Sequence, residues 1–217
     1  SVHIYAKTEW TNPGGSVKDR AALFIIRDAE KSGDLTPGMT LLDSTSGNMG
    51  ISYATFAAAR GYQVTLCLPE NVSPERKKTL QALGAELIFT DAMEGSDGAI
   101  IQARAMVAQD PEKYYYADQY NNPSSWHGHY HTTGPEIINQ TQSRVTHFLC
   151  GLGTSGTMMG AGSYLKEHNQ TIQIIAIQPE GPFHGIEGLK HMDSSIRPGF
   201  YNENLPDIHL PVRTEDA

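Results

Sequence analysis

The chain has 217 residues, with 16 Lys and Arg against 24 Asp and Glu, and a formal net charge of −8. This acidic balance, without any run rich in Lys and Arg, argues against a protein that reads nucleic acid. The longest uninterrupted apolar run, residues 21–26, is far shorter than the roughly 20 residues that a membrane-spanning helix needs. A hydrophobic fraction of 39% with 18% charged residues is typical of a globular protein rather than a disordered one.

Strand, Gly-rich turn and helix alternate along the chain. Strands are predicted at 2–10, 40–45, 63–69, 86–91, 114–118, 146–151 and 172–180. Helices are predicted at 17–31, 49–60, 74–83, 97–109, 123–140 and 157–168. Several of the strands are continuous apolar runs, as in parallel sheets that helices cover on both faces. Most strand starts are one βαβ unit apart, so the predicted fold class is α/β with open, mainly parallel sheets.

Two lobes are expected, with a boundary near residues 132–142, where a polar stretch precedes a new buried strand. Ligands of α/β proteins usually bind in a cleft at the ends of the strands. Residues 181–217 contain four prolines and no periodicity, so they are predicted to be loop with short irregular pieces. A start without Met and an irregular tail lead us to expect a chain truncated at both ends.

Cysteine usage indicates the redox compartment. Two cysteines, Cys67 and Cys150, are too few for a disulfide framework. Both lie in apolar, strand-like runs, so they are predicted to be buried thiols in a reducing compartment, which favours the cytoplasm.

The first of three loops that carry chemistry, residues 12–20, reads Asn-Pro-Gly-Gly-Ser-Val-Lys-Asp-Arg. Ser16 followed by Asp19 fits a helix N-cap with an acid three residues later, which places Lys18 in the first helical turn. The helix dipole repels a positive charge there and so favours the neutral amine. A neutral lysine amine is what a Schiff-base nucleophile or a proton shuttle requires. The alternative is an exposed lysine beside Asp19.

The second loop, residues 44–50, reads Ser-Thr-Ser-Gly-Asn-Met-Gly, and it follows a predicted strand and opens a helix. Backbone N–H groups at a helix start, with hydroxyls beside them, form a site for a carboxylate or a phosphate. Asn48 adds a side-chain amide that can bond a phenolate or a carboxylate. The alternative is an ordinary capped turn.

The third loop, residues 151–157, reads Gly-Leu-Gly-Thr-Ser-Gly-Thr and lies between a predicted strand and a predicted helix. Its G-x-G-x-x-G pattern lets the backbone approach a phosphate closely. One interpretation is a dinucleotide site, with Glu180 as the acid that bonds the ribose. The other is a single phosphate held by N–H and hydroxyl donors.

Together the loops supply a reactive amine, an anion-binding turn and a phosphate cup, which are the parts of a pyridoxal phosphate site. The chain resembles the cysteine synthase family of fold-type II pyridoxal-phosphate enzymes, most closely the B isozyme. The resemblance covers essentially the whole chain, in the family's order. Its motifs stand at residues 12–20, 45–48, 118–123, 132–137, 153–157 and 178–180.

The resemblance implies a role for each loop. Lys18 would be the catalytic residue and would hold the aldehyde carbon of the cofactor, while Asn48 would bond the ring oxygen. The cofactor phosphate would be bound by Gly153, Thr154, Ser155, Gly156 and Thr157. The substrate carboxylate would be bound by Thr45, Ser46, Gly47, Asn48 and Gln119.

The resemblance also implies a two-lobed fold like that of the tryptophan synthase beta subunit. The smaller lobe would span residues 34–135. The larger would combine 1–33 with 136–217 and contain the first strand, the lysine helix and the phosphate-binding loop. Two family segments are missing: a Gly-Asn-Thr-Pro-Leu stretch before the first strand, and a Gly-Ser-Ser-Gly type turn whose serine faces the pyridine nitrogen. In addition, Met49 stands where the family usually has Thr, which removes one hydroxyl from the substrate loop.

The activity that the resemblance implies is that of a transferase in cysteine biosynthesis. O-acetyl-L-serine, or another activated serine such as O-phosphoserine, would react with sulfide or a related donor to give L-cysteine. A cytoplasmic homodimer is expected, with no nucleic-acid partner, no membrane partner and no metal. Alternatives are a cystathionine β-synthase-like or serine/threonine dehydratase activity, an NAD-dependent dehydrogenase, and a non-catalytic truncated binding partner.

Three further features of the sequence involve a lysine, a pair of histidines and a charged run. Lys190, in the segment after the strand at 172–180, is expected to reach the outer end of the substrate and to favour a negatively charged one; the alternative is a solvated loop residue. His127 and His131 have the spacing of a zinc pair on a helix, but no third ligand is evident. The charged run at 75–78 is predicted to be a solvated helix face.

Overall fold

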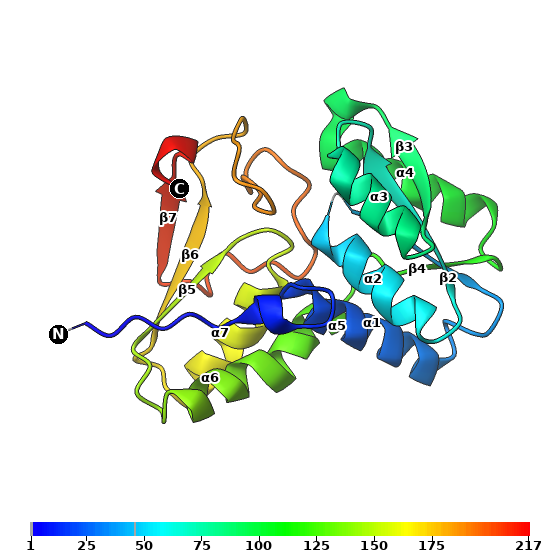
Figure 1. Cartoon of the computed structure of the whole chain (residues 1–217). Helices are drawn as coiled ribbons and strands as arrows, with labels where there is room; N and C mark the ends of the chain where they lie inside the picture. The colour runs from blue at the N-terminus through cyan, green and yellow to red at the C-terminus, as the bar shows by residue number, and fades with distance from the viewer. Residues whose placement is uncertain (1, 46) are drawn as a thin grey trace. The chain divides into compact units, whose positions relative to one another are not determined.

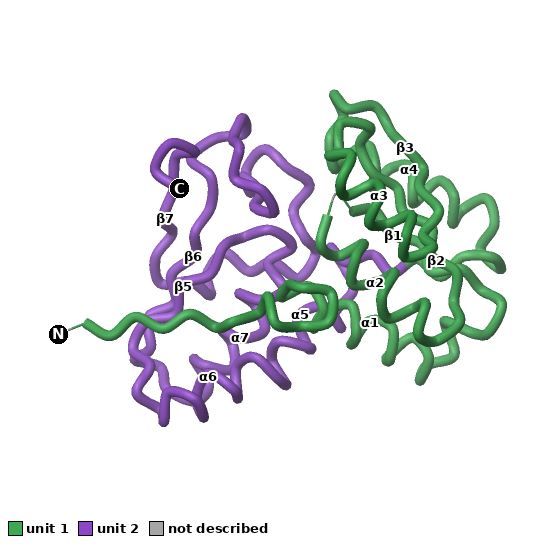
Figure 2. The backbone as a smooth tube through the Cα atoms, in the orientation of Figure 1, with its two compact units in different colours: residues 1–116 green, residues 117–217 purple. Residues whose placement is uncertain are grey.

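The computed structural model describes residues 2–45 and 47–217 (Figure 1). Its contacts divide the chain into two compact units, Ser1–Tyr116 and Ala117–Ala217 (Figure 2). The boundaries implied by the resemblance, at residues 34 and 135, differ from this division and stay a prediction. Ser46, one of the predicted carboxylate-binding residues, lies outside the described residues.

The first unit contains a four-stranded parallel sheet in the order β3-β2-β1-β4. The strands are β1 (Thr40–Ser44), β2 (Gln63–Pro69), β3 (Glu86–Thr90) and β4 (Tyr114–Tyr116). Every residue of β1 and six of the seven residues of β2 are buried. For the continuous apolar run of β2 this confirms the prediction of a strand buried on both faces.

Four helices accompany this sheet: α1 (Lys18–Ser32), α2 (Asn48–Ala58), α3 (Pro74–Ala82) and α4 (Gly95–Gln109). Ala99 and Ala103 of α4 pack on the sheet face that carries Leu42 and Cys67. Burial, with a smaller contribution from the nearby charge of Asp43, raises the pKa of the Cys67 thiol to about 12. A thiol of this kind is inert, as the sequence predicts. The first turn of α2 lies on the other face, against Leu66.

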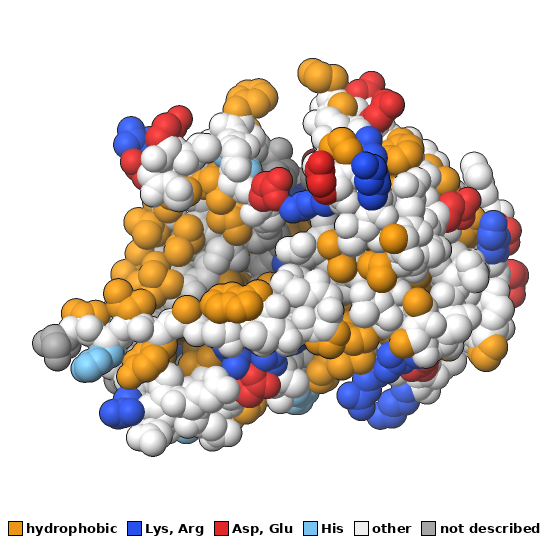
Figure 3. All heavy atoms as spheres, viewed as in Figure 1, with side chains coloured by type: hydrophobic (Ala, Val, Ile, Leu, Met, Phe, Trp, Pro, Cys, Tyr) orange, Lys and Arg blue, Asp and Glu red, His pale blue; other side chains and the backbone are white. Residues whose placement is uncertain are grey.

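The second unit has a three-stranded parallel sheet in the order β5-β6-β7. Its strands are β5 (His147–Gly151), β6 (Gln173–Pro179) and β7 (Ile208–Val212). Its helical segments are α5 (Ser124–Gly128), a π-helix (His129–Thr133), α6 (Gly134–Gln140) and α7 (Gly156–His168). Met158 and Leu165 of α7 pack with Ile174 of β6 to form the core of this unit. Leu149, Ile208 and Leu210 leave apolar surface exposed on the sheet (Figure 3).

Most predicted elements are confirmed, and two predictions are wrong. Residues 2–8 form no strand, and a 3₁₀ turn follows at Glu9–Thr11. Val2 and Ile4 are 88% and 90% exposed. This segment does not pair with a strand of the first unit, so it gains none of the hydrogen bonds that stabilise a β-sheet. The predicted irregular tail contains β7, which was hidden by Pro211. Proline is tolerated there because β7 pairs with β6 alone, at the edge of the described sheet.

The second cysteine is less buried than predicted. Cys150 is half-buried, whereas full burial was predicted for both cysteines.

Among the residues that the structure describes, no helix combines the length and the apolar character needed to cross a membrane.

A close helix crossing holds the second unit together. The predicted helix at 123–140 is continuous in direction but passes through a π-helical turn at His129–Thr133. At the crossing, a Cβ on Gly160 of α7 would overlap the carbonyl oxygen of Trp126 and lie 2.6 Å from Cβ of His129. Only glycine allows the two backbones to approach so closely.

Gly160→Ala is therefore expected to destabilise the second unit by about 1–3 kcal/mol, because overpacking against backbone cannot be relieved by a rotamer change. The matched control is Gly162→Ala in the same helix, where the nearest atom to a new Cβ is Leu205 Cδ2 at 3.3 Å. That variant should unfold at the same or a higher urea concentration, since alanine is the better helix former by up to about 1 kcal/mol. Equal urea midpoints for the two variants, followed by circular dichroism, would refute the crossing argument.

Candidate functional site

The first loop is anchored by a buried carboxylate. Asp19, only 3% exposed, accepts hydrogen bonds from the Gly14 N–H at 2.5 Å and from the Ser52 hydroxyl of α2. A Cβ on Gly14 would overlap this carboxylate, so glycine is required there by the close approach. The anchor fixes the loop immediately before Lys18, which is half-buried and is the first residue of α1.

This arrangement corrects the predicted capping box. The residue that precedes α1 is Val17, and its side chain makes no capping bond. Ser16 Oγ instead accepts the Lys18 N–H at 3.3 Å, and Asp19 reaches past Ser16 to Gly14. The placement of Lys18 in the first helical turn is nevertheless confirmed. Its backbone therefore lies where the helix dipole disfavours a cation, as the sequence predicts.

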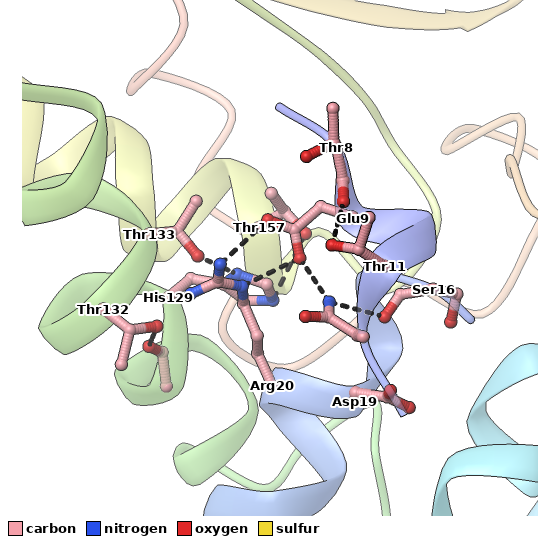
Figure 4. A network of polar contacts seen from close by, with 12 residues as sticks. Thr8, Glu9, Thr11, Ser16, Asp19, Arg20, His129, Thr132, Thr133 and Thr157 are labelled. Carbon is pink, nitrogen blue, oxygen red and sulfur yellow. Dashed lines mark hydrogen bonds and ion pairs between the residues drawn. The ribbon is translucent and has the colours of Figure 1, made fainter. Parts of the chain in front are cut away.

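A second ring of polar contacts closes the same loop from the other side (Figure 4). Arg20 pairs with both carboxylate oxygens of Glu9, with Nε–Oε2 2.8 Å and Nη2–Oε1 3.0 Å. The Asn12 amide donates to Glu9 Oε2 at 2.7 Å and to the Ser16 carbonyl at 3.0 Å. Glu9 and Arg20 side chains are each only 16% exposed, so this bidentate pair is worth more than an ordinary surface pair.

The second loop leads into α2. The Thr45 side chain accepts the Gly47 N–H at 3.3 Å and is buried, whereas Asn48 is exposed at the start of the helix. Met49, in the position of the usual threonine, is 2% exposed, so this side chain is directed into the protein. The hydrogen bond between Asp19 and Ser52 links the first turn of α1 to the second turn of α2. The structure therefore brings the first two predicted loops together.

The third loop forms an anion cradle at the start of α7. Ser155 has φ +64° and precedes the helix. A left-handed residue next to a helix start turns successive N–H groups toward one point, which makes a concavity suited to anions. Within the described part of the chain, Ser155 Oγ is buried without a hydrogen-bond partner, as is Ser125 Oγ of α5. Unpaired buried hydroxyls cost about 1–3 kcal/mol each, so their presence at one helix start favours a bound ligand there.

The glycines of this loop are needed for packing as well as for approach to a ligand. A Cβ on Gly156 would lie 2.9 Å from Ser125 Oγ, and one on Gly153 would overlap the Gly188 carbonyl oxygen. Thr154 Oγ1 accepts the Gly156 N–H at 3.4 Å. The loop is therefore held by α5 on one side and by the segment around residue 188 on the other.

A buried histidine orients the last residue of the loop (Figure 4). His129 is 2% exposed, and its Nε2 lies 3.3 Å from Thr157 Oγ1 while its Nδ1 lies 2.9 Å from Thr133 Oγ1. With both ring nitrogens engaged, the imidazole has one orientation and so limits the rotamers of Thr157. The sequence pattern around His129 does not indicate this contact, because Thr157 is 28 positions away along the chain.

Lys190 and Gln119 also lie in the second unit. Lys190 is 8% exposed, and its Nζ lies 4.6 Å from the centre of the Tyr120 ring. Its backbone N–H donates to the carbonyl of Leu152, the second residue of the third loop, at 2.8 Å. Lys190 is therefore not a solvated loop residue. Gln119, beside Tyr120, is 3% exposed. Burial of both was not evident from the sequence, because neither lies in a periodic element.

Comparison with known proteins adds independent findings. The model of a family described as pyridoxal-phosphate dependent enzymes matches residues 1–202. Cysteine synthase from Aquifex aeolicus is 55% identical over 216 residues, and cysteine synthase B from Salmonella typhimurium is 43% identical over 214 residues. These alignments cover 100% and 99% of this chain, and 66% and 70% of the relatives.

A solved structure agrees with these relatives. Cysteine synthase from Entamoeba histolytica superposes with a TM-score of 0.90 at 37% identity, over 97% of this chain and 64% of that one. The chain thus spans about two thirds of the length of the proteins it resembles, 66% of the A. aeolicus enzyme and 64% of the E. histolytica structure. The fold-type II architecture predicted from the resemblance is confirmed.

Asp19→Ala should lower the free energy of unfolding by about 2–4 kcal/mol, because the Gly14 N–H and the Ser52 hydroxyl both lose their acceptor in a buried environment. Ser52→Ala removes one of the two bonds and should cost about half as much. Urea unfolding followed by tryptophan fluorescence and circular dichroism measures both losses. A loss for Asp19→Ala no larger than that for Ser52→Ala would show that Asp19 does not anchor the loop.

Proposed function

Because the chain belongs to the pyridoxal-phosphate dependent enzyme family, we propose that the complete protein is a cysteine synthase, a transferase that replaces the leaving group of O-acetyl-L-serine with sulfide. The single observation that carries this proposal is 55% identity to a cysteine synthase over the whole chain. The contacts within each unit support it: the first unit contains Lys18 and the loop before α2, and the second contains the loop before α7.

The cradle at the start of α7 fits the cofactor phosphate. Ser155 Oγ and Ser125 Oγ are buried and have no partner among residues 2–45 and 47–217. A phosphate brings acceptor oxygens that hydroxyls and helix N–H groups can bond. Residues that would hold the phosphate are Gly153, Thr154, Ser155, Gly156 and Thr157. Asn48 would bond the ring oxygen, since its side chain is exposed at the start of α2.

Lys18 is proposed to hold the cofactor and to move the substrate proton. When bound, pyridoxal phosphate withdraws electrons from the Cα of an amino acid and so makes its proton removable. The helix dipole disfavours positive charge on an amine in the first turn of α1, which suits Lys18 to take that proton and later return it. The anchor at Asp19 holds the backbone of Lys18 in place for both transfers.

The substrate carboxylate is proposed to bind at the start of α2 with help from Gln119. Thr45, Ser46, Gly47 and Asn48 supply hydroxyl, N–H and amide donors at this helix start. Donors of these types suit a carboxylate, and the helix dipole adds to the attraction. Location in the cytoplasm and assembly into a homodimer are proposals that rest on the resemblance alone.

Product analysis with the complete protein tests the activity. O-acetylserine with sulfide should give cysteine, and Lys18→Ala should lower kcat by about 10²–10⁴, the range for loss of a general base. The matched control is Lys31→Ala, an exposed lysine in the last turn of the same helix, which should keep the normal rate. Cystathionine from homocysteine, or pyruvate from serine, as the main product would instead assign one of the alternative activities. A Lys18→Ala variant with an unchanged rate would remove Lys18 from the mechanism.

Lys190 is expected to favour a substrate with a negatively charged side chain. Its ammonium lies on the Tyr120 ring, where partial shielding from water strengthens attraction to a phosphate group. Lys190→Ala should therefore reduce kcat/KM for O-phosphoserine roughly tenfold relative to O-acetylserine, as expected for the loss of one charge-assisted contact. If the ratio of the two kcat/KM values is the same in both proteins, Lys190 does not select the leaving group.

A further inference from the structure

An arginine lies against the start of α2, where the sequence predicts only a solvated charged face. Arg76 is in the first turn of α3, after Ser73, whose side chain accepts the Arg76 N–H at 3.4 Å. Its side chain is half-buried. A Cβ on Gly47 would overlap Arg76 Nη1 and lie 3.3 Å from its Cζ, so the guanidinium rests on the backbone of Gly47.

The packing of α2 on α3 holds the arginine in this position. A Cβ on Gly50, in the first turn of α2, would lie 3.3 Å from Leu80 Cδ2 of α3 and 2.9 Å from Leu66 Cδ1 of the sheet. Leu80 is 1% exposed. The first turn of α2 therefore packs on α3. Because Arg76 belongs to this packed helix, its guanidinium is held against Gly47.

The electrostatics of this contact favour an anion. The N-terminus of a helix carries roughly half a positive charge, and Arg76 belongs to the first turn of α3 while it touches the residue that precedes α2. The guanidinium thus adds positive charge next to the start of α2. An anion bound at this helix start is attracted by the helix dipole and by the guanidinium together.

The two neighbouring cations of α3, Lys77 and Lys78, have different surroundings from Arg76. Lys77 Nζ donates to the Glu70 carbonyl at 2.5 Å and lies 4.9 Å from the centre of the Phe89 ring. Lys78 is exposed on the same helix. The predicted solvated run is therefore wrong for Arg76 and Lys77, which are half-buried, and it is confirmed for Lys78.

We propose that Arg76 is a positioning residue that strengthens binding of the substrate carboxylate at the start of α2. This inference rests on the proposed function, in which the loop at 45–48 holds that carboxylate. Arg76 supports the Gly47 backbone and supplies positive charge beside the N–H donors, and it takes no part in proton transfer. It should therefore affect affinity for a charged ligand and leave affinity for an uncharged analogue unchanged.

The test compares two ligands on the complete protein loaded with cofactor. L-serine carries the carboxylate, and L-serinamide replaces it with a neutral amide. Binding of each is followed through the visible absorbance of the cofactor. Arg76→Gln should raise the Kd of L-serine about three- to tenfold, the effect of one partly buried charge interaction, with the Kd of L-serinamide unchanged. Arg76→Lys should keep most of the preference, and the control Lys78→Gln, which removes an equal charge from the exposed face, should keep all of it.

The possible outcomes separate the inference from the proposed function. A protein that binds L-serine as expected but forms no cysteine would contradict the proposed function and leave the role of Arg76 intact. Equal weakening of both ligands in Arg76→Gln, no weakening at all, or no preference for L-serine in the unaltered protein would overturn the inference. Loss of folding in both Arg76 variants would make the residue structural and would overturn it as well.

Discussion

The buried carboxylate of Asp19 is the interaction on which the first unit's chemistry depends. It accepts a hydrogen bond from the loop that precedes Lys18 and another from Ser52 of α2. One side chain therefore sets the start of α1, which carries Lys18, and ties it to α2, where the substrate carboxylate is proposed to bind. A charged acceptor in a buried position must be saturated with donors, which is why Gly14, with no side chain, approaches it so closely.

The proposed phosphate site in the second unit depends on donors that the protein leaves available. Ser155 adopts a left-handed conformation at the start of α7, and its buried hydroxyl has no partner among the residues that the structure describes. The surrounding contacts are tight: α5 packs on Gly156, and His129 orients Thr157. A rigid cradle of this kind loses little entropy when a phosphate binds. The same close packing requires glycine at positions 153 and 156, whatever the ligand.

The sequence predicts the fold class well and the site partly, for physical reasons. A continuous apolar run identifies β2, and the loop motifs predict the helix starts at Lys18, Asn48 and Gly156 closely. The β7 strand was missed because its pairing with β6 is a long-range property. The capping box was wrong because Asp19 has a competing donor 33 positions away, at Ser52. Nor does local charge pattern distinguish Arg76 from Lys78, since only the packing of α2 on α3 separates them.

The central claim is that Lys18, at the start of α1, is the residue that holds the cofactor. The most direct measurement is borohydride reduction of the cofactor-loaded complete protein, followed by proteolysis and mass mapping of the labelled peptide. Reduction makes the link between cofactor and lysine permanent, so the label reports the attachment point without any need for turnover. The account predicts that the peptide containing Lys18 carries the label. A label on any other lysine, or none in a protein that retains its cofactor, would contradict it.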